Sequence, residues 1–244
     1  VHCQAAETNN DEKQPQTIRV GSFEDTFNYM DKNGVRRGYG YELMQALAGY
    51  TGWKFEYVKC DWSNCFDKLE NGEIDIMGDI SYTDERAQKM LFSDEPMSEE
   101  KYILYADLSN MDLGMSDFKS MDGKRVGVLM DTEPEIMLTE WENKNGIHTE
   151  HVNVNNDNDV EKKLANHEID CFVSLEESIW SEQGISSVTT IGKSGIYFAI
   201  NKERSDIKTE LDWAMRQLEQ DSPFFQADLY KTVSYTHTLP TTER

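Results

Sequence analysis

A short pattern occurs twice in the chain, and it constrains the fold more than any other feature of the sequence. Arg-Val-Gly stands at Arg19–Gly21 and again at Arg125–Gly127. Later in each half comes Leu-x-Asn-x-Glu-Ile-Asp, ending at Asp75 and at Asp170. Each half then reads as strand, helix, turn and strand. Two copies in the same order predict two α/β lobes of similar build, and a chance echo in an acidic sequence is the alternative.

Length and charge narrow the possible functions. The 244 residues are enough for one large or two small domains with a real core. The chain carries 24 Lys and Arg against 46 Asp and Glu, a formal net charge of −22. Such a surface repels nucleic-acid phosphates and anionic membranes, so neither is an expected partner. No run of 18 apolar residues is present.

Periodicity places the secondary structure. Amphipathic spacing predicts five helices, at Tyr41–Tyr50, Asn64–Glu70, Thr132–Asn143, Val160–Asn166 and Asp206–Gln220. Strand-like runs lie at Thr17–Gly21, Lys54–Val58, Ile74–Ile80, Tyr102–Tyr105, Arg125–Met130, Ile169–Leu175 and Ile196–Ile200. Two of these strands bracket the second echo, so the first lobe is expected to be discontinuous. The expected domains are a polar segment 1–16, lobe 1 at 17–105 plus 196–231, lobe 2 at 106–195 and an atypical tail at 232–244.

Several short motifs follow one another in the order of a known family. They are Thr17–Gly21, Gly38–Leu43, Trp62, Asn71–Asp75, Tyr82–Arg86, Phe92–Asp94, Gly123–Gly127 and Asp170. In this order the sequence resembles the bacterial extracellular solute-binding proteins that bind polar amino acids, over about residues 17–231. Gly38–Leu43, Thr51–Trp53 and Ser81–Arg86 are most similar to sensor domains of histidine kinases and diguanylate-cyclase receptors. The resemblance implies a two-lobed type II periplasmic-binding-protein fold with two crossover strands, in which ligand lies between the lobes.

The resemblance assigns ligand contacts in lobe 1. Arg86 of the Thr-x-x-Arg element would grip a carboxylate, a role for which its planar fork of donors is suited. Thr83 would cap the helix that Arg86 opens, and Ser81 would add a hydroxyl. A surface arginine paired with Glu85 or Asp84 is the alternative. Asp79 is a further candidate in lobe 1, because it could bind an ammonium group or a sugar hydroxyl; capping the strand end is the alternative. The aromatic residues Trp62, Phe27 and Phe23 could pack on the ligand, and the alternative for Trp62 is a position that caps the core.

Lobe 2 departs from the pattern of the family. Asp131-Thr132-Glu133 stands where Gly-Ser-Thr is expected, so Thr132 keeps one hydroxyl while Glu133 would repel an anion. The family's ammonium-binding Asp is replaced by Leu175, flanked by Ser174 and Glu176. Half of the α-amino-acid clamp is therefore altered, which argues against a standard amino acid. We expect a small polar ligand that is amino-acid-like or another carboxylate.

Cysteine and histidine patterns add little. Cys60 and Cys65 are close enough to form a disulfide in an exported protein, and two free, partly buried thiols are the alternative. His148 and His151 would point to opposite faces of an extended run, which disfavours a zinc site. No metal or other cofactor is expected.

We expect a binding domain located outside the cytoplasm, membrane-tethered in the full-length protein, and no enzymatic activity. Its partners would be a small polar solute and either a membrane permease or its own C-terminal signalling module. A cyclohexadienyl-dehydratase-like enzyme is the first alternative, with Glu133, Glu176 or Asp79 as its acid or base. A ligandless spacer or protein-interaction module is the second. Residues 234–244 resemble a translated sequencing adapter and are excluded from the fold argument.

Overall fold

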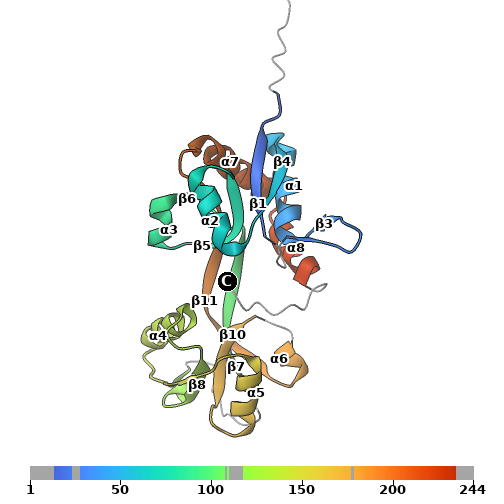
Figure 1. Cartoon of the computed structure of the whole chain (residues 1–244). Helices are drawn as coiled ribbons and strands as arrows, with labels where there is room; N and C mark the ends of the chain where they lie inside the picture. Colours follow the sequence, from blue (N-terminus) through green and yellow to red (C-terminus); the bar gives the residue numbers. More distant parts are fainter. Residues whose placement is uncertain (1–13, 24–27, 108, 110–117, 177–178, 235–244) are drawn as a thin grey trace, which may run out of the picture. The chain divides into compact units, whose positions relative to one another are not determined.

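The pattern that occurs twice in the sequence forms the same arrangement of strands twice in the structure. This computed structural model describes residues 14–23, 28–107, 109, 118–176 and 179–234 (Figure 1). Unit 1 extends to Ser98 and resumes at Ile196, and unit 2 is Glu99–Gly195. The chain leaves unit 1 within β7 (Ser98–Ala106) and returns within β11 (Ser186–Asn201). The sequence predicts that lobe 1 first ends at Tyr105, but unit 1 ends at Ser98. The difference arises because β7 begins at Ser98, before the apolar residues from which the strand was predicted.

Unit 1 is built on a β-α-β-α-β segment. It consists of β1 (Thr17–Ser22), α1 (Tyr39–Thr51), β4 (Lys54–Lys59), α2 (Trp62–Asn71) and β5 (Ile76–Ser81). The three strands are parallel in the order β4-β1-β5, with Val20 beside Ile76. The final part of β11 adds an antiparallel strand next to β5 and also pairs with β6 (Met90–Phe92).

Unit 2 repeats this topology. Its elements are β8 (Arg125–Val128), α4 (Glu133–Asn145), β9 (Glu150–Asn153), α5 (Asp157–Ala165) and β10 (Cys171–Leu175). The parallel order is β9-β8-β10, which matches β4-β1-β5 element by element. Strand β7 completes the unit by pairing antiparallel with β10.

The repeated residues explain the repeated topology. In unit 1 the Asp75 carboxylate accepts hydrogen bonds from the backbone N–H of Arg19 at 2.8 Å and from its Nη2 at 2.8 Å. In unit 2 Asp170 accepts from the N–H of Arg125 at 2.8 Å and from its Nη2 at 3.0 Å. Each pair joins the start of the first strand to the turn before the third. The sequence echo is therefore a structural repeat and not a coincidence.

The glycine of each echo leaves room for a buried isoleucine side chain, which a larger residue would displace. A Cβ atom on Gly21 would be 2.6 Å from the Cδ1 of Ile74, the isoleucine of Glu-Ile-Asp. The corresponding Cβ on Gly127 would be 2.9 Å from the Cδ1 of Ile169. Both isoleucines are buried, so Arg-Val-Gly and Glu-Ile-Asp pack against each other in both units.

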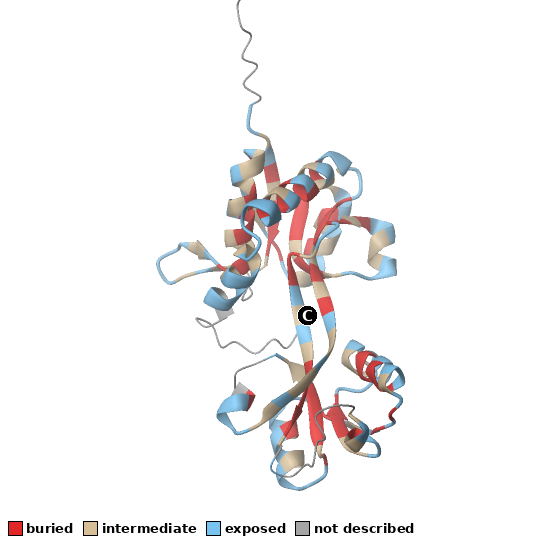
Figure 2. Cartoon of the chain, turned by 180° about the vertical axis from the view of Figure 1, so that it is seen from behind, coloured by how far each residue is buried: buried red, intermediate tan, exposed pale blue. Residues whose placement is uncertain are grey.

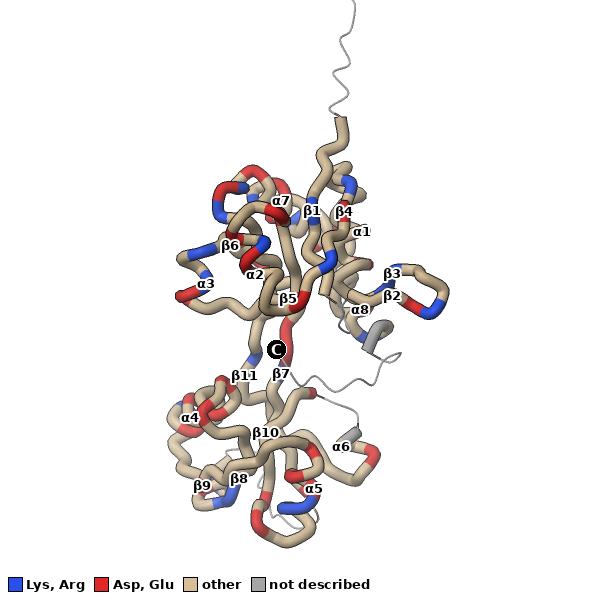
Figure 3. The backbone as a smooth tube through the Cα atoms, in the orientation of Figure 1, with Lys and Arg blue, Asp and Glu red and all other residues tan. Residues whose placement is uncertain are grey.

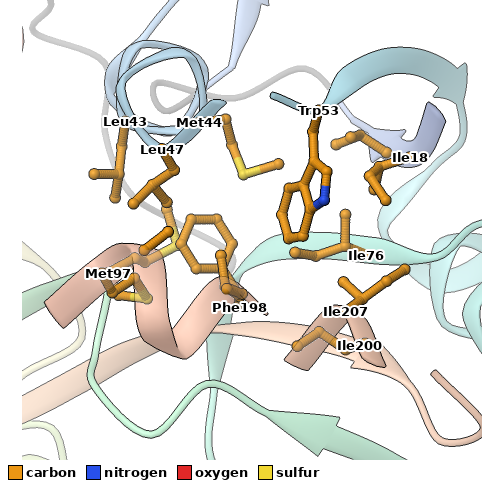
Figure 4. Close-up of a cluster of buried hydrophobic side chains, with 14 of the residues drawn as sticks. Ile18, Leu43, Met44, Leu47, Trp53, Ile76, Met97, Phe198, Ile200 and Ile207 are labelled. Atoms are coloured by element: carbon orange, nitrogen blue, oxygen red, sulfur yellow. The ribbon is translucent and has the colours of Figure 1, made fainter. Parts of the chain in front are cut away.

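Helices cover both faces of the sheet in each unit. In unit 1, Ile76 packs with α1 and α7 (Ser205–Asp221), whereas its neighbour Met77 packs with α2 on the other face. Figure 4 shows the first of these clusters, with Trp53 and Phe198 at its centre. In unit 2, α4 covers one face, and α5 with α6 (Ile179–Glu182) covers the other. Figure 2 shows buried residues concentrated on the strands and on the inner sides of the helices.

The remaining elements are short or terminal. They are β2 (Tyr29–Met30), β3 (Arg36–Arg37), α3 (Asp84–Lys89), a 3-10 turn at Lys119–Met121 and α8 (Phe225–Ser234), which packs on α1. Acidic residues occur in the described parts of both units (Figure 3). Within the described ranges, no helix has the length and apolar character needed to cross a membrane.

Several helix and strand limits differ from the sequence-based expectation, three of them at the start of an element. Helix α2 begins at Trp62 instead of Asn64, because Asp61 and Asn64 form a capping box. Helix α5 begins at Asp157, and its cap is Asn156, whose side chain accepts the N–H of Asp159. Strand β11 begins at Ser186, ten residues before Ile196, where the apolar run predicted its start. At the C-terminus α8 continues to Ser234, so residues 232–234 of the expected atypical tail are helical, and 235–244 lie outside the described residues.

Candidate functional site

Arg86 is held in place by three contacts from unit 1. Its backbone N–H is bound by the Thr83 hydroxyl at 3.1 Å, so Thr83 caps α3 as expected. Its Nη1 donates to the Ser81 carbonyl at 2.9 Å. Its guanidinium carbon lies 5.0 Å from the centroid of the Phe66 ring. The guanidinium is thus oriented before any ligand arrives.

The surface-pair alternative for Arg86 does not form. In the parts of the chain that the structure describes, no carboxylate lies within 4.0 Å of this guanidinium, although Asp84 and Glu85 are close in sequence. Arg86 is partly exposed. A partly exposed, oriented guanidinium with unused donors is suited to a carboxylate.

Three aromatic rings lie in a row beside this arginine. Phe23 and Trp62 meet edge to face at 5.1 Å, and Trp62 and Phe66 meet in the same way at 5.1 Å. All three are partly buried against a core cluster of unit 1. Trp62 therefore borders the core and also belongs to the row. We name Phe23, Trp62 and Phe66 the aromatic row.

Phe66 was missed by the sequence analysis. The available signal was its spacing of four residues from Trp62 on a helix, which puts both rings on one face. The Cys60–Cys65 disulfide links the end of β4 to α2, and this fixes the start of the helix that carries both rings. Of the two alternatives that the sequence left open for this pair, the disulfide is the one that forms, whereas Cys171 is a buried free thiol. Phe27, the remaining aromatic candidate, lies outside the described residues.

Asp79 lies in a bulge of β5. Between the pairs Ile80–Tyr197 and Met77–Ala199, strand β5 has two residues, Gly78 and Asp79, opposite Phe198 alone. Asp79 has a φ of 64°, in the left-handed region. Bulges of this kind redirect side chains and are common next to functional sites. Asp79 is buried, with 6% of its surface exposed, so it does not simply cap an exposed strand end.

The unit 2 candidates are engaged with their own unit. The Thr132 hydroxyl donates to the Leu129 carbonyl, and it makes no capping bond to α4. The Glu133 carboxylate accepts a hydrogen bond from the Ser194 hydroxyl at 3.1 Å. Glu176 is exposed, with its Oε2 4.0 Å from the Nζ of Lys101. Ser174 is partly buried in β10 opposite Ile103. Thr132 and Ser174 retain acceptor capacity, and Glu133 is held by Ser194.

A second titratable cluster lies elsewhere in unit 2. His151 in β9 contacts two glutamates of α4, with Nδ1 3.0 Å from Glu135 and Nε2 2.8 Å from Glu142. Glu142 is buried and also accepts the hydroxyl of Thr149. His151 is therefore part of an ionic cluster and not of an H-x-x-H metal site. No metal-binding group of three or more side chains occurs within the described ranges.

This cluster predicts a pH dependence of stability. Burial lowers the pKa of His151, but the two glutamates raise it more, so that the folded pKa lies above the usual value. A raised pKa means that the stabilisation is complete below about pH 6.5 and is lost as the pH rises through the folded pKa. We expect urea unfolding to give a higher free energy at pH 6 than at pH 8.5. In His151→Gln this part of the difference should vanish, and an unchanged profile would contradict the assignment.

Two similar α/β units joined by two strands are the architecture of type II periplasmic binding proteins. The fold class predicted from the sequence is therefore confirmed. A solved structure of the second substrate-binding domain of a putative amino acid ABC transporter from Streptococcus pneumoniae superposes with a TM-score of 0.66 at 20% identity. It covers 88% of this chain and 99% of that one. This likeness shows the fold.

Residues 18–227 match the family model of bacterial extracellular solute-binding proteins, family 3, and the chain belongs to this family. A probable histidine-binding protein of Neisseria gonorrhoeae is 33% identical over 104 residues, 42% of this chain and 38% of that protein. The histidine-binding periplasmic protein of Escherichia coli K12 is 23% identical over 229 residues, 86% of this chain and 85% of that protein. The alignment with the gonococcal relative thus spans well under half of its length.

Proposed function

We propose that this chain is a binding domain that captures an amino acid or a related small carboxylate outside the cytoplasm. The observation that carries the proposal is Arg86, oriented by Thr83, Ser81 and Phe66 and free of any ion pair within the described residues. Two relatives bind histidine by their names, which agrees with a carboxylate ligand. The Cys60–Cys65 disulfide agrees with an oxidising compartment.

Each group would have a distinct task in binding. Arg86 would pair both carboxylate oxygens, because its fork matches their geometry. The Ser81 hydroxyl would add a hydrogen bond, and the aromatic row would pack on the rest of the ligand. From unit 2, Thr132 and Ser174 would contribute acceptors, and Glu176 would favour a ligand with a positive group.

We further propose that binding serves uptake or signalling, and not catalysis. The named relatives favour delivery of the solute to a membrane permease. The segments Gly38–Leu43 and Ser81–Arg86, with their similarity to sensor domains, favour a membrane-tethered receptor. Glu133, offered above as a catalytic acid or base, is exposed and accepts a hydrogen bond from Ser194, so it lacks the apolar pocket in which such a catalytic carboxyl group usually lies.

A thermal-shift screen followed by calorimetry tests the proposal. The panel contains the twenty amino acids, polyamines, betaines, sugars and prephenate-like acids. We expect at least one amino acid in large excess to raise the melting temperature clearly, because ligand that binds only the folded state stabilises it. If no solute stabilises the wild-type chain, the spacer or protein-interaction reading is favoured.

Arg86→Ala should weaken binding of that solute by about 1.5–3 kcal/mol, the value of a charged hydrogen bond. The matched control is Arg37→Ala, because Arg37 is an exposed arginine of the same unit whose Nε pairs with Asp31 at 3.2 Å. The control should bind as the wild type does. Equal affinities of the Arg86→Ala variant and the wild type would refute the carboxylate assignment.

A further inference from the structure

A small cavity in unit 1 shares Phe23 with the aromatic row. Its volume is about 30 Å³, and Asp79 and Phe23 both line it. Phe23 also belongs to the aromatic row, and Asp79 lies on the same strand as Ser81, so the cavity adjoins the candidate carboxylate site. Most of the other walls are apolar, among them Met44, Ile76 and Phe198 (Figure 4).

Asp79 lines this cavity from an unusual backbone conformation. The left-handed conformation at Asp79 is one that glycine adopts without strain and other residues adopt at a cost. Strain of this kind persists where the surrounding structure requires it, and it concentrates at binding sites. At this position of the β5 bulge the chain has an aspartate, although the left-handed backbone conformation favours glycine.

Two positive features lie beside the cavity. The first turn of α1 contributes Gly40 and Tyr41 to the cavity, and the positive end of a helix stabilises a nearby anion. The other is Arg36, which contacts two residues that line the cavity. Its guanidinium carbon lies 4.2 Å from the Tyr57 ring centroid, and its Nη1 donates to Asn28 at 2.9 Å and to Ser22 at 2.7 Å. Arg36 is not among the residues that line the cavity.

We propose that this cavity binds a primary ammonium group of the ligand, with Asp79 as its counter-ion. This inference rests on the proposed function. Since Leu175 replaces the acid expected in unit 2, Asp79 would supply the missing charge from unit 1. Apolar walls strengthen such a charge pair, because they lower the local dielectric constant.

The size of the cavity determines which cations fit. About 10–15 Å³ suffices for one water molecule, so the cavity of about 30 Å³ accepts a group of that size. An ammonium group is about as large as water and fits. A guanidinium group and a trimethylammonium group each have four heavy atoms and are too large. The site should therefore select primary amines and reject guanidinium and quaternary ammonium groups.

Matched probes test the inference by calorimetry on the whole chain. L-Norleucine carries only an α-ammonium group and 6-aminohexanoate only a terminal one, and the N-trimethyl form of each is its oversized counterpart. We expect one of the two amines to bind and its trimethyl form to bind at least tenfold more weakly. Equal binding of the trimethyl form would overturn the inference. The amine that binds identifies which ammonium group enters.

Variants separate charge from backbone strain. Asp79→Asn keeps the side-chain shape and tolerates the left-handed conformation, and it should weaken binding of the amine about 10- to 100-fold. Asp79→Gly should also weaken binding while raising the melting temperature, because it relieves the backbone. The control is His167→Gly, since His167 has a φ of 57° in unit 2 and should gain stability without losing affinity.

The outcomes distinguish this inference from the proposed function. If a probe binds and depends on Arg86 but not on Asp79, the inference is wrong and the proposed function stands. If affinity falls in Asp79→Asn but not in Arg86→Ala, the ammonium site stands and the carboxylate assignment fails. If neither amine nor any member of the solute panel binds the wild-type chain, both are wrong.

Discussion

Phe172→Ala is expected to lower the free energy of unfolding by about 3–5 kcal/mol, the range for removing a buried aromatic ring. Phe172 is fully buried in the core of unit 2. Its ring centroid lies 4.6 Å from that of Trp180 and 5.5 Å from that of Tyr105. The alanine variant would leave a cavity between these large rings. Urea unfolding followed by circular dichroism measures the loss.

The conservative variant keeps this prediction testable if Phe172→Ala does not fold. Phe172→Leu retains much of the volume and should lose less than half as much stability as the alanine variant. A loss below about 1 kcal/mol in the alanine variant would show that the ring is not part of a packed core.

Asp75→Ala is expected to destabilise the protein by about 3 kcal/mol, at the upper end of the range for hydrogen bonds to a charged group. The Asp75 side chain is only 3% exposed and pairs with Arg19 at 2.8 Å and Arg204 at 2.9 Å. Burial raises the pKa of Asp75. The hydrogen bonds and charges of these arginines lower it by more, so that the pKa in the folded protein lies below the usual value. Its stabilisation is therefore present above about pH 4 and is lost as the pH falls.

The structural repeat provides the matched control, Asp170→Ala. Asp170 makes the same contacts to Arg125, but its side chain is 27% exposed and it has no counterpart of Arg204 within the described chain. We expect its loss to destabilise by only about 1–2 kcal/mol. Equal effects, or a larger effect at Asp170, would contradict the argument from burial.

Much of the fold was readable from the sequence because its signals are local and repeated. Arg-Val-Gly and Glu-Ile-Asp occur twice, and both copies form the same ion pair and the same glycine–isoleucine contact. Helix limits were less accurate where a side chain fixed them. Asp61 and Asn156 cap α2 and α5 through hydrogen bonds to the first turn of each helix. The spacing of apolar residues carries no information on such hydrogen bonds, so it does not predict where a helix begins to within a residue or two.

The candidate site was only partly readable. Arg86 and Thr83 lie on one short segment, so a motif could indicate them together. Phe66 comes from a different element, and only folding brings its ring to 5.0 Å from the arginine. Glu133 likewise accepts a hydrogen bond from Ser194, a residue distant in the sequence that only folding brings close.

The sequence by itself determined the two similar units, the acidic surface and the arginine motif, because each depends on residue type and short spacing. Only the tertiary structure decided that Asp79 lies in a bulge and lines a cavity. The β5 bulge arises from the pairing of β5 with β11, two strands far apart in the sequence. Pairing between distant strands fixes register and bulges through packing, which no local pattern encodes.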